Sequence, residues 1–242
     1  MTTDRHEIRI AGISVEVVRK EIKHLHIGVY PPAGRVRVAA PVRLEDEAVR
    51  LAVVSRLGWI CRKQKEFEGQ DRQSRRELVA GESHYFQGRR YLLEVKQCDS
   101  RPGVRIKGPA RMELCVPSGA DRDQRDAVLQ RWYRRELRKL IAPMLVKWEA
   151  RVGKPVSEVR IKRMKTRWGS CNADAGRIWL NLELIKKPVA CLEYVLVHEM
   201  VHLHERHHND RFLKRMEALM PTWRVHRDEL SRAPLAHEEW TY

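Results

Sequence analysis

Five histidines lie within eighteen residues of this 242-residue chain, in the segment VLVHEMVHLHERHHNDRF at positions 195–212. Its centre is HEMVH, which contributes His198, Glu199 and His202. Residues four apart lie on the same face of a helix, so both imidazoles can bind one metal ion. Glu199 directly follows the first histidine, where its carboxylate can reach water at the ion without being a ligand. The spacing predicts a metal centre with Glu199 as general base.

A catalytic zinc also needs a third protein ligand and an open coordination position. His208 lies six residues after His202, which leaves room for the helix to end and the chain to fold back. Histidines at the first, fifth and eleventh positions match the spacing of metzincins, but those proteins have glycine at the eighth position. Glu205 stands there in this chain, so the sequence is not assigned to the metzincins. His208 is the preferred third ligand, and His207 and Glu217 remain alternatives.

The helix that carries this motif is expected to be packed in the core. Apolar residues precede the motif on one side, namely Leu192, Val195, Leu196 and Val197. Histidines set into such a helix need partners, because a buried polar group costs free energy when it is unsatisfied. This disfavours the competing interpretation, a set of hydrogen-bonded surface histidines at a helix end. His204 points to another helix face and is expected to face solvent.

The elements before the motif are predicted from hydrophobic periodicity. Residues 1–44 alternate as β-strands, and residues 45–67 have a helical pattern with one apolar face. That face is formed by Ala48, Leu51, Val54, Leu57 and Ile60. Two or three further strands follow, including a hairpin with Gly88 in its turn. No internal repeat is evident.

A long helix is predicted from an N-cap at Asp121 to about residue 151, with Pro143 as the site of a kink. The segment NADAG at 172–176 reads as a tight turn between two strands. Pro188 suits the first turn of the motif helix, which is expected to run to about residue 206. Two short helices complete the chain. The fold class is therefore α+β, with a β-rich region at 1–118, a helical and small-sheet metal-binding region at 119–232, and a loose tail at 233–242.

Hydropathy and cysteine content indicate the expected cellular location of the protein. No apolar run approaches the roughly 18 residues of a membrane span, and the first residues lack an export signal, so a cytoplasmic protein is expected. The five cysteines are scattered and odd in number, which favours reduced thiols.

The net charge of +16 attracts polyanions such as nucleic acid. One face of the long helix carries Arg131, Arg134, Arg135, Arg138 and Lys139, which either bind phosphates or form a solvated surface.

Two sequence blocks together resemble the YgjP-like metallopeptidases, relatives of the SprT-like zinc proteases. TRWGSCNADAGRIWLNLEL at 166–184 is similar to the family's Arg-Trp-Gly-Ser-Cys block and the hairpin after it. YVLVHEMVHLHERHHNDRF at 194–212 matches its His-Glu-x-x-His with a later histidine at His208. The family's Phe-Trp and Asn-His-Ser-Pro read Phe212-Leu213 and His207-His208-Asn209-Asp210 here. The resemblance implies a zincin-like fold, bound Zn²⁺ and cleavage of peptides.

This resemblance suggests roles for neighbouring residues. Tyr194, Arg167 and Asn181 are candidates for contacts with the transition state or substrate. The strand at 178–182 is expected to bind an extended peptide by edge pairing. In the WGSC segment, Trp168 is expected in the core and Gly169 is expected to turn the chain.

Two other functions remain open on the sequence. One is metal-dependent hydrolysis of nucleotides or other phosphoesters, which suits the basic surface. The other is binding of nucleic acid with a structural zinc, although structural sites favour cysteine ligands.

Overall fold

The computed structural model describes residues 5–30, 34–68, 76–98, 101–164 and 167–232. The chain divides into two compact units, Met1–Asp71 and Arg72–Tyr242. This boundary precedes the predicted one at residue 118, because the strands after residue 76 share a hydrophobic core with the helices that follow them. Sheets and helices occur in both units, so the fold is mixed α and β.

The first unit is a four-stranded sheet followed by two short helices. The strands are β1 (Arg5–Ile10), β2 (Ile13–Lys20), β3 (His26–Tyr30) and β4 (Arg35–Pro41), in the order β1-β2-β4-β3. The helices are α1 (Asp46–Val54) and α2 (Leu57–Glu68). Alternate strand residues such as Val15, Val17, Val36 and Val38 form the core, as the alternating pattern predicts.

The helical stretch of this unit differs from its prediction in two respects. It forms two helices instead of one, and α1 ends at Ser55, whose hydroxyl donates to the carbonyl of Ala52. The predicted apolar face is also wrong for α1, since Leu51 and Val54 are 64% and 53% exposed. Val49 and Val53 are buried in their place, whereas Ile60 is buried as predicted. Both sets of residues have helical spacing, so periodicity alone did not distinguish the face that meets the sheet.

The second unit begins with a sheet that repeats the topology of the first. Its strands are β5 (Ser83–Phe86), β6 (Arg89–Gln97), β7 (Gly103–Lys107) and β8 (Arg111–Val116), in the order β5-β6-β8-β7. Both sheets combine an antiparallel hairpin, a parallel pair and a second antiparallel pair. The hairpin turns also agree, with positive φ at Ala11-Gly12 and Gln87-Gly88. The structure thus reveals a repeat that was not evident in the sequence.

Two cysteines of this sheet form a disulfide, contrary to the expectation of reduced thiols. Cys98 and Cys115 are separated by 17 positions in the sequence, and their Cα atoms are 5.8 Å apart. Parallel pairing of β6 with β8 brings them together. The sequence did not predict this disulfide, because it depends on the pairing of two strands that are distant in the sequence.

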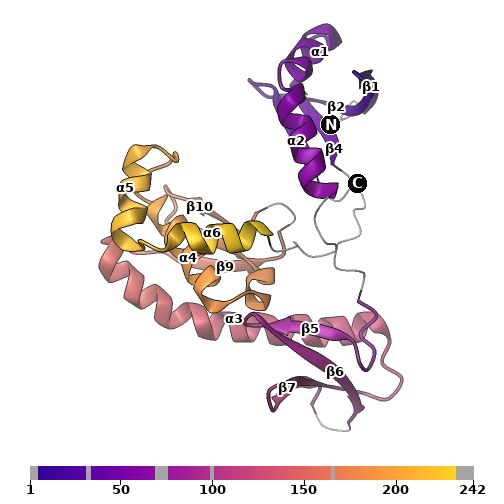
Figure 1. Ribbon diagram of the computed structural model, residues 1–242, viewed down its shortest axis with the longest axis vertical. Helices are drawn as coiled ribbons and strands as arrows, with labels where there is room; N and C mark the ends of the chain where they lie inside the picture. Colours follow the sequence, from indigo (N-terminus) through magenta and orange to yellow (C-terminus); the bar gives the residue numbers. More distant parts are fainter. Residues whose placement is uncertain (1–4, 31–33, 69–75, 99–100, 165–166, 233–242) are drawn as a thin grey trace. The chain divides into compact units, whose positions relative to one another are not determined.

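Helix α3 (Arg122–Val152) connects this sheet with the elements that carry the histidine motif (Figure 1). It begins at the predicted N-cap Asp121, which forms a capping box with Gln124, and it continues through Pro143. In its first half, the hydroxyl of Tyr133 donates to the carbonyl of Tyr85 in β5. Near its end, Trp148 donates to Glu193 on the motif helix.

The remaining elements surround the motif. They are β9 (Glu158–Lys162), β10 (Gly169–Asn172), β11 (Arg177–Asn181), the 3-10 helix η1 (Leu182–Lys186), α4 (Val189–Val201), α5 (Asp210–Leu219) and α6 (Trp223–Arg232). The sheet order is β10-β11-β9, so β11 is the middle strand. Peptide binding at a free edge of residues 178–182 is therefore wrong, because both sides of β11 are paired. Among the described residues, no helix is long and apolar enough to span a membrane.

Candidate metal centre

Helix α4 is the central element of the site, as the apolar residues before the motif predict. Nine of its residues are buried, including Leu192, Val195 and Leu196. The helix contacts α3, α5, α6, β10 and β11. It ends at Val201, earlier than predicted, but His202 at the C-cap keeps helical backbone angles. The four-residue spacing of His198 and His202 therefore still places both side chains on one face.

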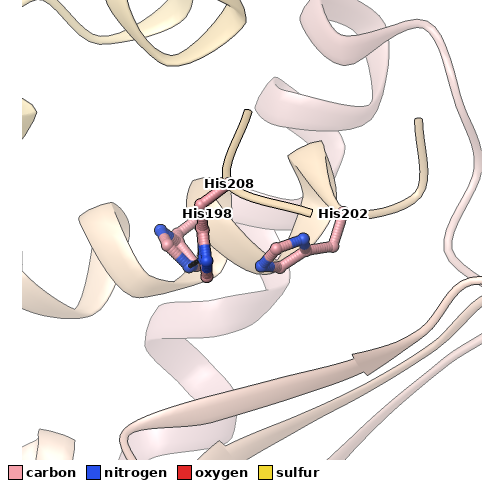
Figure 2. Close-up of side chains that lie close together, drawn as sticks. All are labelled: His198, His202 and His208. Atoms are coloured by element: carbon pink, nitrogen blue, oxygen red, sulfur yellow. Dashed lines mark hydrogen bonds between the residues drawn. The ribbon is translucent and has the colours of Figure 1, made fainter. Parts of the chain in front are cut away.

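Three imidazoles meet at the end of α4 (Figure 2). His198 and His202 come from the helix, and His208 comes from the segment that folds back before α5. Their potential ligand atoms all lie within 4.8 Å of one another. The Nε2 atoms of His198 and His208 are 3.0 Å apart. Two nitrogens on a tetrahedral zinc are separated by roughly 3.3 Å when each bond is about 2.0–2.1 Å long, so this spacing suits a shared metal ion.

The protonation of these histidines also suits metal binding. Burial and the two neighbouring histidines lower the pKa of His198 to about 3. Burial lowers the pKa of His202 as well. Nδ1 of His202 lies 2.9 Å from the carbonyl oxygen of Glu205 and donates to it in the neutral ring, which leaves the Nε2 lone pair available. Neutral imidazoles are the form that binds metal.

Phe212 supports all three imidazoles, a role that the residue spacing did not predict. It is buried, and its ring centroid is 4.9 Å from that of His198 and 4.7 Å from those of His202 and His208. Asn209 is the N-cap of α5 and accepts a hydrogen bond from the Phe212 amide. The four-residue interval between His208 and Phe212 was the available sequence signal.

Glu199 lies in a tight space beside β10. It is 6% exposed, and a Cβ atom added to Gly169 would lie 2.6 Å from its Oε1. Gly169 begins a strand and does not turn the chain, so its predicted role is wrong. The glycine instead leaves room for the carboxyl group. Burial raises the pKa of Glu199 to about 8, and the positive charge of Arg167 acts in the opposite direction.

The other predicted site residues have different surroundings. Tyr194 is buried, with its ring 5.8 Å from His198 and stacked 6.3 Å from Trp223. Arg167 is exposed at the entry to β10. Asn181 is fully buried. Its amide bonds to the backbone of Met164, Arg167 and Glu183. This side chain thus orients the segment that carries Arg167.

The residues of the WGSC segment lie partly in the core. Trp168 and Cys171 are half-buried and pack against the core of the second unit, and Lys187 lies 5.6 Å from the Trp168 ring. Burial and the charge of Glu199 raise the pKa of the Cys171 thiol to about 11.

The alternative third ligands lie elsewhere. Glu217 accepts hydrogen bonds from Trp223 and Arg224. His207 is exposed and does not belong to the histidine cluster among the described residues. His204 lies beyond the end of α4 and so is not on a face of that helix, and it is not solvent-facing: its Nε2 lies 2.9 Å from the carbonyl oxygen of Val152.

Comparison with known proteins adds independent information. A family model described as "YgjP-like, metallopeptidase domain" matches residues 25–233. Among solved structures, the chain is similar to the metallopeptidase zymogen of Pyrococcus abyssi abylysin, with 22% identity and a TM-score of 0.34. That match covers 36% of this chain and 89% of the other. No curated protein matches the chain.

Proposed function

We propose that this chain, which belongs to the YgjP-like metallopeptidase family, is a zinc-dependent peptidase. Membership supports a metal-dependent hydrolase. His198, His202 and His208 are the proposed zinc ligands, and Glu199 is the proposed general base. The observation that carries the proposal is the meeting of three imidazoles, one of them from His198, which directly precedes the buried Glu199 on the same helix. The three histidine nitrogens are sufficient as protein ligands for the metal. Glu199 is therefore not needed as a ligand and is available for proton transfer.

Each residue of the proposed site has its own role in the reaction. Zinc held by three histidines supplies a Lewis acid that activates water near neutral pH. Glu199 accepts a proton at its carboxylate and passes it to the leaving amine of the peptide. Phe212 packs against the three rings and fixes their orientation. Gly169 thus leaves room for the Glu199 carboxyl group, and Phe212 positions the three imidazoles.

The substrate is proposed to be an extended peptide bound along β10. This strand is an edge of its sheet among the described residues, and it begins at Gly169 beside Glu199. An unpaired strand edge offers backbone groups to an added strand. Arg167 precedes β10 and Tyr194 adjoins His198, so both are proposed to contact the substrate or the developing oxyanion. Asn181 contributes through the position of Arg167.

Replacement of Glu199 by glutamine tests this mechanism. Glutamine has nearly the same volume but does not accept a proton at neutral pH. Zinc content should stay near that of the wild type, while peptide hydrolysis should fall by ~10²–10⁴-fold. Zinc is measured by mass spectrometry and turnover with casein or a peptide library. A His202→Ala control should lose both metal and activity. Full activity in Glu199→Gln with zinc retained would refute the general-base role.

A second function, binding of nucleic acid or another polyanion, is favoured by one cavity of about 840 Å³ between α3 and the β7–β8 end of the sheet. Its lining includes Lys96, Arg101, Arg105, Arg131, Arg135 and Arg138. Two local carboxylates reduce the positive charge, since Glu113 pairs with Lys96 and Glu136 pairs with Arg135. The remaining guanidinium groups suit phosphates.

Salt-dependent binding tests this second function. Duplex DNA should bind weakly, with an affinity that falls steeply with salt because counterions are released. Replacing Arg131, Arg135 and Arg138 by glutamate should weaken binding. The exposed residues Arg43, Arg50 and Arg56 provide a charge-matched control. An equal loss of DNA affinity in both triple variants would show that net charge alone causes the binding and that this cavity is not the binding site. Nucleoside triphosphates are tested in parallel as substrates of a phosphoester hydrolase.

A further inference from the structure

A second group of metal-binding side chains lies between α4 and α6. Cys191, in the first turn of α4, is fully buried. Its Sγ is 3.2 Å from Oε2 of Glu229. Potential ligand atoms of Cys191, His226 and Glu229 all lie within 4.8 Å of one another. His226 and Glu229 are three positions apart on α6, so their side chains share one face of that helix.

The imidazole of His226 has an unsatisfied nitrogen. Its Nε2 lies 3.4 Å from the hydroxyl of Thr222. Its Nδ1 is buried and has no hydrogen-bond partner among the described residues. A buried polar atom without a partner costs free energy and calls for an explanation. The nearby thiol and carboxylate are themselves metal-binding groups, so a cation at this position would use all three side chains.

We propose that Cys191, His226 and Glu229 bind a second divalent transition-metal ion, of the zinc or cobalt type, which links α6 to α4. Thiolate and imidazole ligands favour such ions over magnesium or calcium. The S–H bond of Cys191 breaks on binding, its proton passes to solvent, and the sulfur electron pair forms the bond to the metal. The thiolate and carboxylate then balance the double positive charge. Water completes a tetrahedral set.

Neighbouring groups act on the Cys191 sulfur in both directions. In the metal-free protein, burial and Glu229 raise the pKa of the thiol to about 12, and the positive charge of Lys187 acts in the opposite direction. The positive charge of a bound metal ion would favour the thiolate. Glu193 lies near His226 but already accepts from Lys147 and Trp148, so it is not counted as a ligand.

The position of this pair of helices gives the second ion a structural consequence. Tyr194 lies one helical turn after Cys191 and stacks on Trp223, the first residue of α6. The Tyr194 ring also adjoins His198. An ion that holds α6 against α4 would therefore fix one side of the proposed catalytic centre.

Cobalt spectroscopy distinguishes this site from the histidine centre. Three histidines give no thiolate-to-cobalt charge-transfer absorption, whereas a site containing Cys191 does. Full-length protein, stripped of metal with a chelator and titrated with Co²⁺, should show this near-ultraviolet band and bind two ions per chain. Cys191→Ser should remove the band and leave one ion. His202→Ala should retain the band, so the inference and the proposed peptidase activity can fail separately.

Further variants control for indirect effects of folding and of other thiols. His226→Gln changes a half-buried residue and should weaken Co²⁺ binding at this site by at least about 10-fold. Cys61→Ser, in the first unit, should leave the band unchanged. Circular dichroism checks the fold of each variant. A wild-type protein that binds one ion without the band, or a Cys191→Ser protein that keeps the band, would overturn the proposal and leave a thiol hydrogen-bonded to Glu229.

Discussion

Substitution of Gly169 by alanine should separate metal binding from catalysis. The added Cβ atom would lie 2.6 Å from Oε1 and 2.7 Å from Cγ of Glu199. Ordinary contacts at such positions begin at about 3.4 Å. The carboxyl group must therefore shift by about 0.8 Å, the difference between the two distances, or β10 must move by a similar amount. The backbone of Gly169 needs no positive φ, so alanine itself introduces no torsional strain there.

The expected effect follows from the size of this displacement. A shift of about 1 Å in a catalytic group costs roughly 10²-fold in rate. Complete loss of a general base costs ~10²–10⁴-fold. We therefore expect turnover of Gly169→Ala to fall about 100-fold, at the mild end of the Glu199→Gln range. The three atoms nearest to the added Cβ all belong to Glu199, so zinc content should stay near that of the wild type.

The assay pairs turnover on one peptide substrate with zinc measurement by mass spectrometry. Gly103→Ala is the matched control, because Gly103 begins another strand of the same unit and its nearest neighbour to a new Cβ is 3.9 Å away. It should retain both zinc and activity. Activity of Gly169→Ala within a few-fold of the wild type, in a protein with normal zinc content and fold, would refute the argument that this glycine makes room for Glu199.

Three further predictions test other parts of the structure. His208→Ala should reduce zinc occupancy, measured by mass spectrometry, far more than His207→Ala. The reverse order would identify His207 as the third ligand in place of His208. Asn181→Ala should lower the free energy of unfolding by at least about 2 kcal/mol, because several buried backbone groups lose a hydrogen-bond partner at about 1–3 kcal/mol each. Urea unfolding measures this change, and an unchanged free energy of unfolding would contradict the role of these hydrogen bonds. Hydrogen bonds from Lys96 and Lys107 lower the pKa of Glu113 from 4.5 to about 2, so its contribution to stability is present above pH 4.5 and is lost as pH falls towards 2. The stability difference between wild type and Glu113→Gln should therefore shrink over that range, and urea unfolding showing a constant difference would exclude the ion pairs as its cause.

The helix-based part of the site could be predicted because its spacing is local. His198 and His202 share a face of α4 whatever the rest of the fold, and the pattern of apolar residues before them indicated a buried helix. The turn to His208 was accessible from sequence spacing for a similar reason. The contact between Gly169 and Glu199 was not accessible, since it joins positions 30 residues apart through the packing of β10 on α4. Glycine suggested a turn because that is its commonest local role.

The same distinction holds for the fold. Alternation identified the strands, and the capping box at Asp121 marked the start of α3. Strand order depends on pairings between distant segments, so the sequence did not indicate that β11 lies between β9 and β10. It likewise did not indicate the Cys98–Cys115 disulfide, which depends on the parallel pairing of β6 with β8.

Burial of Glu199 links its proposed role to the proposed metal. With a pKa of about 8, the carboxyl group of the metal-free protein is mostly protonated at neutral pH. The positive charge of Arg167 lowers this pKa, but the opposing effect of burial is larger. A divalent cation held by the neighbouring imidazoles would stabilise the charged form and lower this pKa. Metal binding is therefore expected to increase the fraction of Glu199 that can accept a proton, so the three histidines would support the function of Glu199 as well as the activation of water.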